Sequence, residues 1–149
     1  MVTWQAFETQ SAELAAFGRE RIHRRVSFLA TIRGDGGPRV HPVTPWIFDG
    51  HLYVRMFDTS PKVADLTGDP RYALHSMMDN DDGEGGEFSL RGEAVPVPDP
   101  AIVEAAFAAV ADFTDRPLVL FDLLVDEVMT TTYAGDETER RRWRAVPAH

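Results

Sequence analysis

Apolar and polar residues alternate along most of the chain, and three stretches depart from this alternation toward the spacing of a helix. The first lies within residues 1–25, where Leu14, Phe17 and Ile22 fall on one face of a single N-terminal helix. The alternating stretches are rich in β-branched and aromatic residues, which favour strands. The pattern predicts six strands: Ser27–Arg33, Arg39–Phe48, His51–Phe57, Arg71–Met78, Glu87–Val97 and Leu118–Tyr133.

Short turns join most of these strands, so neighbouring strands are expected to run antiparallel. Asp49-Gly50 is a strong hairpin signal, because both residues tolerate a positive φ. Pro42 and Pro45 interrupt the second strand, which must bulge or leave one side unpaired, since proline has no N–H to donate. Closure into a small barrel would remove the exposed edges of such a sheet. We therefore expect a mainly β, α+β fold in one domain over residues 1–149, with flanking helices and a C-terminal tail at 134–149.

Two short helices have clear starts. Ser60 precedes Pro61, which pushes Ser60 out of the helical region and suits it to cap a helix that begins at the proline. Asp99 and Pro100 form the same signal before the last strand. These starts matter because a capped helix N-terminus offers free backbone N–H groups to an anion.

The overall composition disfavours several classes of function. The chain has 149 residues, no cysteine and a formal net charge of −9. An acidic surface argues against broad binding to nucleic acid or anionic membranes. The absence of cysteine excludes disulfides, thiolate nucleophiles and zinc–cysteine sites. Neither a signal peptide nor an apolar run of spanning length is visible, and we expect a cytoplasmic protein.

The stretch from Pro38 to Leu66 combines the features of an anion site. Alternation places Arg39 and His41 on one face of the second strand, and Arg55 lies on the third. An arginine in a barrel strand needs either solvent or an anion. Ser60 and Lys62 then add a hydroxyl and an ammonium at a helix start, and both are good partners for phosphate.

Metal sites are disfavoured. The acidic loop Asp79–Gly86 does not fit a calcium loop, because placing Gly85 at the invariant glycine puts Arg91 where the bidentate glutamate belongs. A mobile, solvated loop is the expected alternative. His41, His51 and His75 lie at separate positions without the spacing of a metal or haem site.

Seven segments follow one another along most of the chain: Phe28–Arg33, Gly36–Val43, Asp49–Val54, Ser60–Leu66, Asp69–Arg71, Leu90–Ala94 and Trp143-Arg144. Each is a loose motif alone, but their order and spacing resemble those of the pyridoxamine 5′-phosphate oxidase-related split-barrel flavoproteins. The resemblance implies a homodimer of six-stranded antiparallel Greek-key barrels. It also implies a flavin in each of two clefts at the dimer interface.

The resemblance assigns ten positions to the cofactor: Arg39, Val40, His41, Pro42, Val43, Val54, Arg55, Ser60, Lys62 and Trp143. Residues matching Arg39–Val43 line the flavin, and those matching Val54 and Arg55 lie along its ring and ribityl chain. Ser60 and Lys62 correspond to the residues that hold the phosphate. Trp143 corresponds to a tryptophan near the cofactor cleft, in some cases that of the partner subunit.

The activity implied is that of an FMN-dependent oxidoreductase with an unknown substrate. No catalytic acid or base is assigned, because hydride transfer by a flavin need not use one. Two alternatives remain open on the same fold: a reductase that depends on a deazaflavin, and a non-catalytic module that binds flavin or haem.

Overall fold

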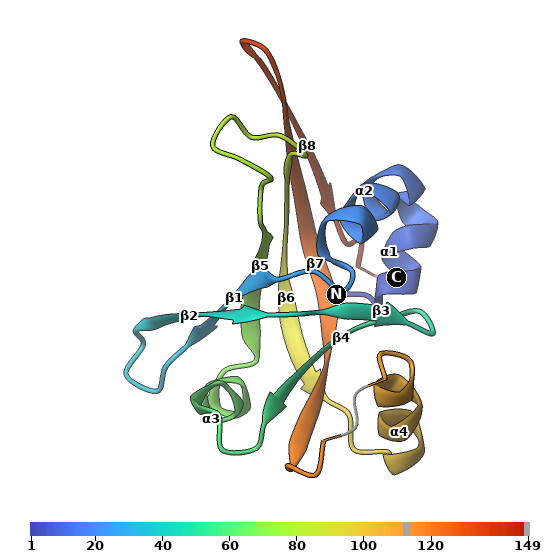
Figure 1. The fold of residues 1–149 in the computed structure, drawn as a ribbon, viewed down its shortest axis with the longest axis vertical. Helices are drawn as coiled ribbons and strands as arrows, with labels where there is room; N and C mark the ends of the chain where they lie inside the picture. Colours follow the sequence, from blue (N-terminus) through green and yellow to red (C-terminus); the bar gives the residue numbers. More distant parts are fainter. Residues whose placement is uncertain (112–113, 148–149) are drawn as a thin grey trace.

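The computed structural model describes residues 1–111 and 114–147, which form one antiparallel sheet and four helices (Figure 1). The strands are β1 Ser27–Ile32, β2 Pro38–Val43, β3 Trp46–Phe48, β4 His51–Phe57, β5 Arg71–Ser76, β6 Glu87–Pro96, β7 Leu118–Ala134 and β8 Glu137–Arg144. The helices are α1 Trp4–Gln10, α2 Ala12–Ile22, α3 Pro61–Gly68 and α4 Pro100–Ala108. None of the helices in these described ranges is long and apolar enough to cross a membrane.

The sheet has eight strands and is not closed by hydrogen bonds. Its order is β2-β1-β5-β6-β7-β4-β3, and β8 pairs with β7 beside this path. The two edge strands, β2 and β3, are separated in sequence only by Thr44 and Pro45. The expected closed, six-stranded barrel is therefore not observed: the second predicted strand is two strands, and the predicted tail contains a further one. The mainly β, α+β class is confirmed.

The break between β2 and β3 follows from Pro45, which cannot donate a ladder hydrogen bond. The carbonyl of Pro45 instead accepts from the backbone N–H of Arg24 at 2.8 Å. Beyond the break, the backbone N–H of Ile47 donates to Nδ1 of His23 at 2.9 Å. The end of the N-terminal helical segment thus holds the bend, and the predicted irregularity at the strand prolines is confirmed.

The longest strand, β7, is the spine of the sheet (Figure 1). Its first part pairs with β4, its last part pairs with β8, and β6 pairs with its middle from Phe121 to Thr131. The pairing of β6 with β7 shifts register between Arg91 and Gly92. This bulge bends the strands where the backbone of Gly92 approaches the carbonyl of Leu124.

Two apolar clusters fill the interior. The larger lies under α1 and α2 and contains Trp4, Phe7 and Phe88, all fully buried. The smaller lies under α4 and includes Leu120, whereas its neighbour Phe121 belongs to the larger cluster. The start of β7 is thus covered on both faces, as its apolar sequence predicts.

The N-terminal segment is two helices instead of the expected single one. Ser11 separates α1 from α2 with φ −149° and ψ 71°, which is not a helical conformation. Its backbone N–H donates to the carbonyl of Phe7 and its carbonyl accepts from Ala15, so each helix keeps a satisfied end. The break lets both short helices lay apolar side chains on the strands.

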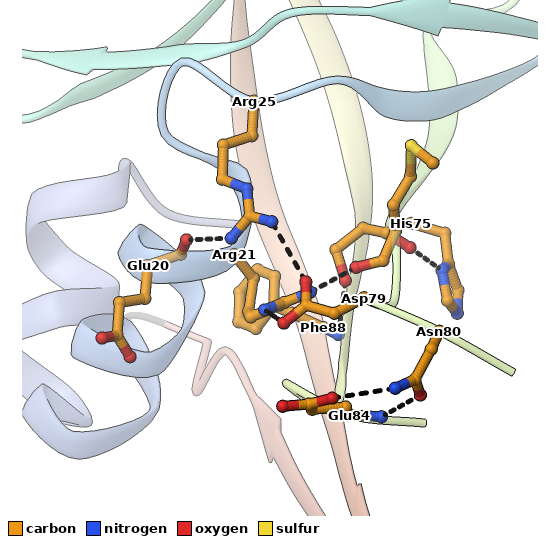
Figure 2. Close-up of polar contacts among 10 residues, drawn as sticks. Glu20, Arg21, Arg25, His75, Asp79, Asn80, Glu84 and Phe88 are labelled. Atoms are coloured by element: carbon orange, nitrogen blue, oxygen red, sulfur yellow. Dashed lines mark hydrogen bonds and ion pairs between the residues drawn. The ribbon is translucent and has the colours of Figure 1, made fainter. Parts of the chain in front are cut away.

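The acidic loop between β5 and β6 is anchored to α2 at its first residue (Figure 2). Nη2 of Arg21 donates to the carbonyl of Met77 at 2.6 Å and to Asp79 at 3.1 Å, and Arg25 contacts the same carboxylate at 3.3 Å. Arg21 is only 5% exposed, whereas the side chain of Asp79 is 43% exposed, so only the arginine end of the contact is shielded from water. The other acidic side chains of the loop are exposed. In the described part of the chain, no group of three or more metal-ligating side chains converges.

Substitution of Gly92 tests the bulge. A Cβ at this position would lie 1.9 Å from the backbone oxygen of Leu124, so Gly92→Ala must push two paired strands apart. We expect a loss of about 1–3 kcal/mol in the free energy of unfolding, the usual cost of overpacking. Urea denaturation measures it. Gly34→Ala is the control, because a Cβ there meets nothing within 4 Å; equal stabilities of the two variants would refute the packing argument.

Candidate anion-binding site

The site is built where the end of β4 meets the start of α3. Ser60 is extended, with φ −66° and ψ 135°, and its hydroxyl oxygen accepts from the backbone N–H of Lys62 at 3.4 Å. Pro61 occupies the first turn, where its missing N–H costs nothing. The predicted cap and helix start are therefore confirmed. They place Lys62 in the first turn of α3, beside the positive end of the helix dipole.

Lys62 is a largely buried residue that lines a pocket. The residue is 9% exposed, and burial lowers the pKa of its side chain below the usual 10.5. The charge of Arg39 lowers this pKa further, whereas Asp65 raises it. Within residues 1–111 and 114–147, no carboxylate forms a salt bridge with Lys62. A cation in this setting is stabilised by an anion that enters the site.

Arg39 forms an ion pair with the buried carboxylate of Asp65. Its Nε donates to Oδ2 of Asp65 at 2.7 Å, and the hydroxyl of Thr31 donates to the same oxygen at 2.8 Å. Burial alone would raise the pKa of Asp65, but the hydrogen bonds from Arg39 and Thr31 outweigh it and hold the pKa below 3.8. The network joins three elements, β1, β2 and α3.

His41 lies on the same side of β2 as Arg39 and is half-buried. Burial lowers the pKa of its imidazole, and the charges of Lys62 and Arg39 lower it further, while Asp65 raises it. The shift shows that His41 belongs to the same electrostatic neighbourhood as the two cations. A bound anion would oppose the shift and favour protonation of His41.

A pocket of about 250 Å³ opens over this neighbourhood. It is lined from the ends of β2 and β4 and the start of α3, including Pro42, Val43, Thr44, Arg55, Ser60 and Lys62. A second pocket of about 380 Å³ shares Thr44 and Arg55 with it and extends to Trp46 and Arg24. Both pockets are lined by Thr44 at the break between β2 and β3, so they lie next to each other.

The structure brings together most, not all, of the residues predicted for the site. Pro42, Val43, Arg55, Ser60 and Lys62 line the first pocket, and Arg39 and His41 lie in the same charged neighbourhood.

Three predicted residues lie elsewhere. The side chain of Val40 points outward and is 62% exposed, and that of Val54 is fully buried in the core. Trp143 pairs with Val128 across β7 and β8, and its ring lies 4.7 Å from that of Phe7. It lines neither pocket of its own chain.

Sequence reasoning missed the carboxylate of Asp65. The signal was present, because Asp65 lies three residues after Lys62 on α3 and therefore on the same helix face. Thr31 gave no signal, since a threonine in a strand is ordinary.

Three of the histidines have local partners. Nδ1 of His51 lies 2.6 Å from Oδ2 of Asp122, and Nε2 of His75 lies 3.2 Å from Glu87. Nδ1 of His23 accepts from the backbone at the bend. Nδ1 of His75 also lies 2.6 Å from the carbonyl oxygen of Ser76, so the contacts occupy both ring nitrogens of His75 and one each of His23 and His51.

Comparison with known proteins shows the fold. No family model matches the sequence, and no curated protein matches it. Among solved structures, a NimC/NimA family protein from Clostridium acetobutylicum superposes with a TM-score of 0.70 at 22% identity, covering 93% of this chain and 96% of that one. A putative pyridoxamine 5′-phosphate oxidase from Listeria innocua gives a TM-score of 0.67 at 19% identity, over 81% and 97% of the two chains.

Proteins named for other cofactors share this fold. An F420 reductase superposes with a TM-score of 0.56 at 20% identity, over 74% of this chain and 94% of that one. A haem-binding protein from Mycobacterium smegmatis gives 0.58 at 19% identity, over 78% and 52% of the two chains. The chain therefore has the split-barrel fold of the pyridoxamine 5′-phosphate oxidase-like proteins, which the sequence resemblance predicted.

Removal of Arg39 tests the network. Arg39→Ala leaves the carboxylate of Asp65 buried without its charged partner, and we expect a loss of about 1–3 kcal/mol in the free energy of unfolding at pH 7. The pKa of Asp65 is lowered by the pairing, so the stability it provides is present above pH 3.8 and lost as the pH falls through the folded-state pKa. The difference between variant and wild type should therefore shrink below about pH 4.

Chemical denaturation at a series of pH values measures this difference. Arg71→Ala is the control, because Arg71 pairs with Asp69 on the exposed surface and should contribute no measurable stability. A difference for Arg39→Ala that stays constant from pH 7 to pH 3 would contradict the network.

Proposed function

We propose that the protein is a cytoplasmic, FMN-dependent oxidoreductase that binds the flavin phosphate between β2, β4 and the start of α3. The observation that carries the proposal is Lys62, a largely buried residue that lines an open pocket beside a capped helix N-terminus and forms no salt bridge with a described residue. A phosphate there would accept a hydrogen bond from the Ser60 hydroxyl and would meet the positive charge of Lys62 at the positive end of the helix dipole.

The residues fit the remainder of such a cofactor as well. The second pocket shares Thr44 and Arg55 with the first, and Trp46 and Arg55 give it both an aromatic and a cationic wall. When bound, FMN would supply the hydride or electron transfer. The chain itself would bind the phosphate, orient the ring along β2 and shield one side of it from water.

Two other cofactors are the competing possibilities. A deazaflavin reductase is favoured by the match to an F420 reductase, and both cofactors carry a phosphate that Ser60 and Lys62 could hold. Haem is disfavoured because His41, His51 and His75 lie at separate positions without the spacing of a haem site.

The visible absorbance of the purified protein separates the three. A flavin spectrum supports the proposal, and an intense Soret band contradicts it. A colourless protein that binds only deazaflavin would replace it with the runner-up. Oxidation of the bound, reduced cofactor by quinones or enones then distinguishes an enzyme from a storage or sensor module.

Lys62→Ala tests the phosphate contact. We expect FMN binding to weaken by about 1.5–3 kcal/mol, the scale of a charge-assisted hydrogen bond, or roughly 10- to 150-fold in Kd. Riboflavin, which lacks the phosphate, should bind the variant and the wild type equally.

Fluorescence titration with both ligands measures these constants. Arg71→Ala is the control, because Arg71 lies beyond the far end of α3 on the exposed surface and lines neither of the two pockets described above. Equal loss of FMN and riboflavin affinity would show that Lys62 does not hold the phosphate.

In this proposal the protein works as a homodimer that shares its clefts, and Trp143 contributes to the cleft of the partner. Support comes from the outer face of β1 and β2, where Phe28 lies across from Pro42 and Ala30 from Val40. Phe28 and Val40 are 40% and 62% exposed. Exposed apolar side chains gathered on a sheet face are typical of a surface that another protein covers.

Val40→Glu tests this assembly. We expect the variant to be a folded monomer with reduced FMN affinity, because a charge on the apolar face opposes its burial. Light scattering coupled to gel filtration measures the mass. Ile102→Glu, at a similarly exposed position on α4, is the control and should remain dimeric. A wild-type monomer with full FMN affinity would contradict the shared cleft.

A further inference from the structure

Two cations, Arg39 and Lys62, and the carboxylate of Asp65 lie close together at the first pocket. Arg39 and Lys62 each lie close enough to affect the charge state of their surroundings, since both lower the pKa of His41 and Arg39 lowers that of Lys62. Asp65 is 6% exposed and acts on Lys62 in the opposite direction. Two like charges at partly buried positions repel each other strongly, so the ligand-free site needs a negative charge nearby.

The geometry places Asp65 behind the cations and away from the pocket. Oδ2 receives both the Nε of Arg39 at 2.7 Å and the hydroxyl of Thr31 at 2.8 Å. Asp65 lines neither pocket, whereas Lys62, one turn earlier on the same helix, lines the first. The bond through Nε leaves the terminal nitrogens of Arg39, with four N–H donors, out of this contact.

Other charged groups face Lys62 from the strands packed around α3. Arg39 and His41 belong to β2, and Arg55 of β4 lines the same pocket. Arg33, just beyond β1, acts on Asp65 by its charge. Among the described residues, Asp65 is the carboxylate whose charge raises the pKa of Lys62.

We infer that Asp65 is a positioning residue of the anion site: it fixes the guanidinium of Arg39 through Nε and supplies the negative charge that keeps Lys62 protonated before a ligand arrives. The inference rests on the proposed phosphate site and adds to it the residue that prepares it. Asp65 itself does not touch the anion, because a carboxylate at the phosphate would repel it. Because Asp65 lies on the side of the cations that faces away from the pocket, their positive charges remain available to an anion in the pocket.

Asp65→Asn separates charge from packing. The side-chain oxygen of asparagine has the same shape and can still accept from Arg39 and Thr31, so the main change is the loss of one negative charge. Lys62 is the only lysine in the chain, so ¹³C labelling of lysine gives one side-chain signal whose pH titration reports the ammonium of Lys62 directly.

We expect the pKa of Lys62 in the ligand-free protein to fall by about one pH unit in Asp65→Asn, at the low end of what a neighbouring opposite charge contributes. Arg39→Gln should move it upward, because one repelling charge is removed. In FMN titrations across pH 6–10, the pH at which affinity falls on the alkaline side should move down with Lys62 in Asp65→Asn. Riboflavin affinity should not change with either variant.

A purely structural ion pair gives a different result. It would lower stability in both variants but leave the pKa of Lys62 and the alkaline limb of FMN binding unchanged, and that outcome would overturn the inference. If Asp65→Asn does not fold, Arg39→Gln is the remaining test. An unchanged pKa of Lys62 in that variant would show that the two cations do not interact, and this result would also overturn the inference. Equal affinities of the wild type for FMN and riboflavin would instead overturn the proposed function, because they would show that the site does not bind the phosphate.

Discussion

The proline at the bend between β2 and β3 is the constraint on which the architecture depends. Because Pro45 cannot donate a hydrogen bond to a neighbouring strand, the predicted second strand divides into β2 and β3. These two edge strands have different partners: β2 pairs with β1, and β3 pairs with β4. The same break leaves room for the two pockets, both of which are lined by Thr44. A fully paired strand would satisfy more backbone groups but would leave no opening there. The opening shared by the two pockets thus follows from a missing N–H group.

Local charge at this opening runs against the charge of the whole chain. The protein carries a net charge of −9, yet Arg39, Arg55 and Lys62 gather around one pocket region. Such a contrast concentrates the attraction for anions at one place, and the acidic remainder of the surface discourages polyanions from binding elsewhere. The cost is electrostatic repulsion among the cations, which the buried Asp65 offsets.

Sequence was a good guide where structure depends on neighbouring residues. The caps at Ser60 and Asp99, the irregularity at the prolines and the two-sided burial of early β7 all follow from local chemistry and are confirmed. The break at Ser11 and the strand β8 were missed, because a serine inside a helical pattern and an arginine-rich tail give weak signals that tertiary packing decides. The pair Arg39–Asp65 spans 26 residues, and such long-range partners are not encoded in any short pattern. The place of Trp143 against Phe7 was missed for the same reason.

The central position of β7 has a consequence for how the chain reaches this structure. β4 and β6 both form their ladders with a strand that begins at Leu118, and β6 depends on it over most of its length. During synthesis the ribosome releases β1 to β6 before β7. The edges of β4 and β6 that pair with β7 therefore stay unpaired until this late segment emerges. Non-local pairing of this kind slows folding, and unpaired edges invite association with other nascent chains. Chaperone protection during translation would therefore matter more for this protein than its small size suggests.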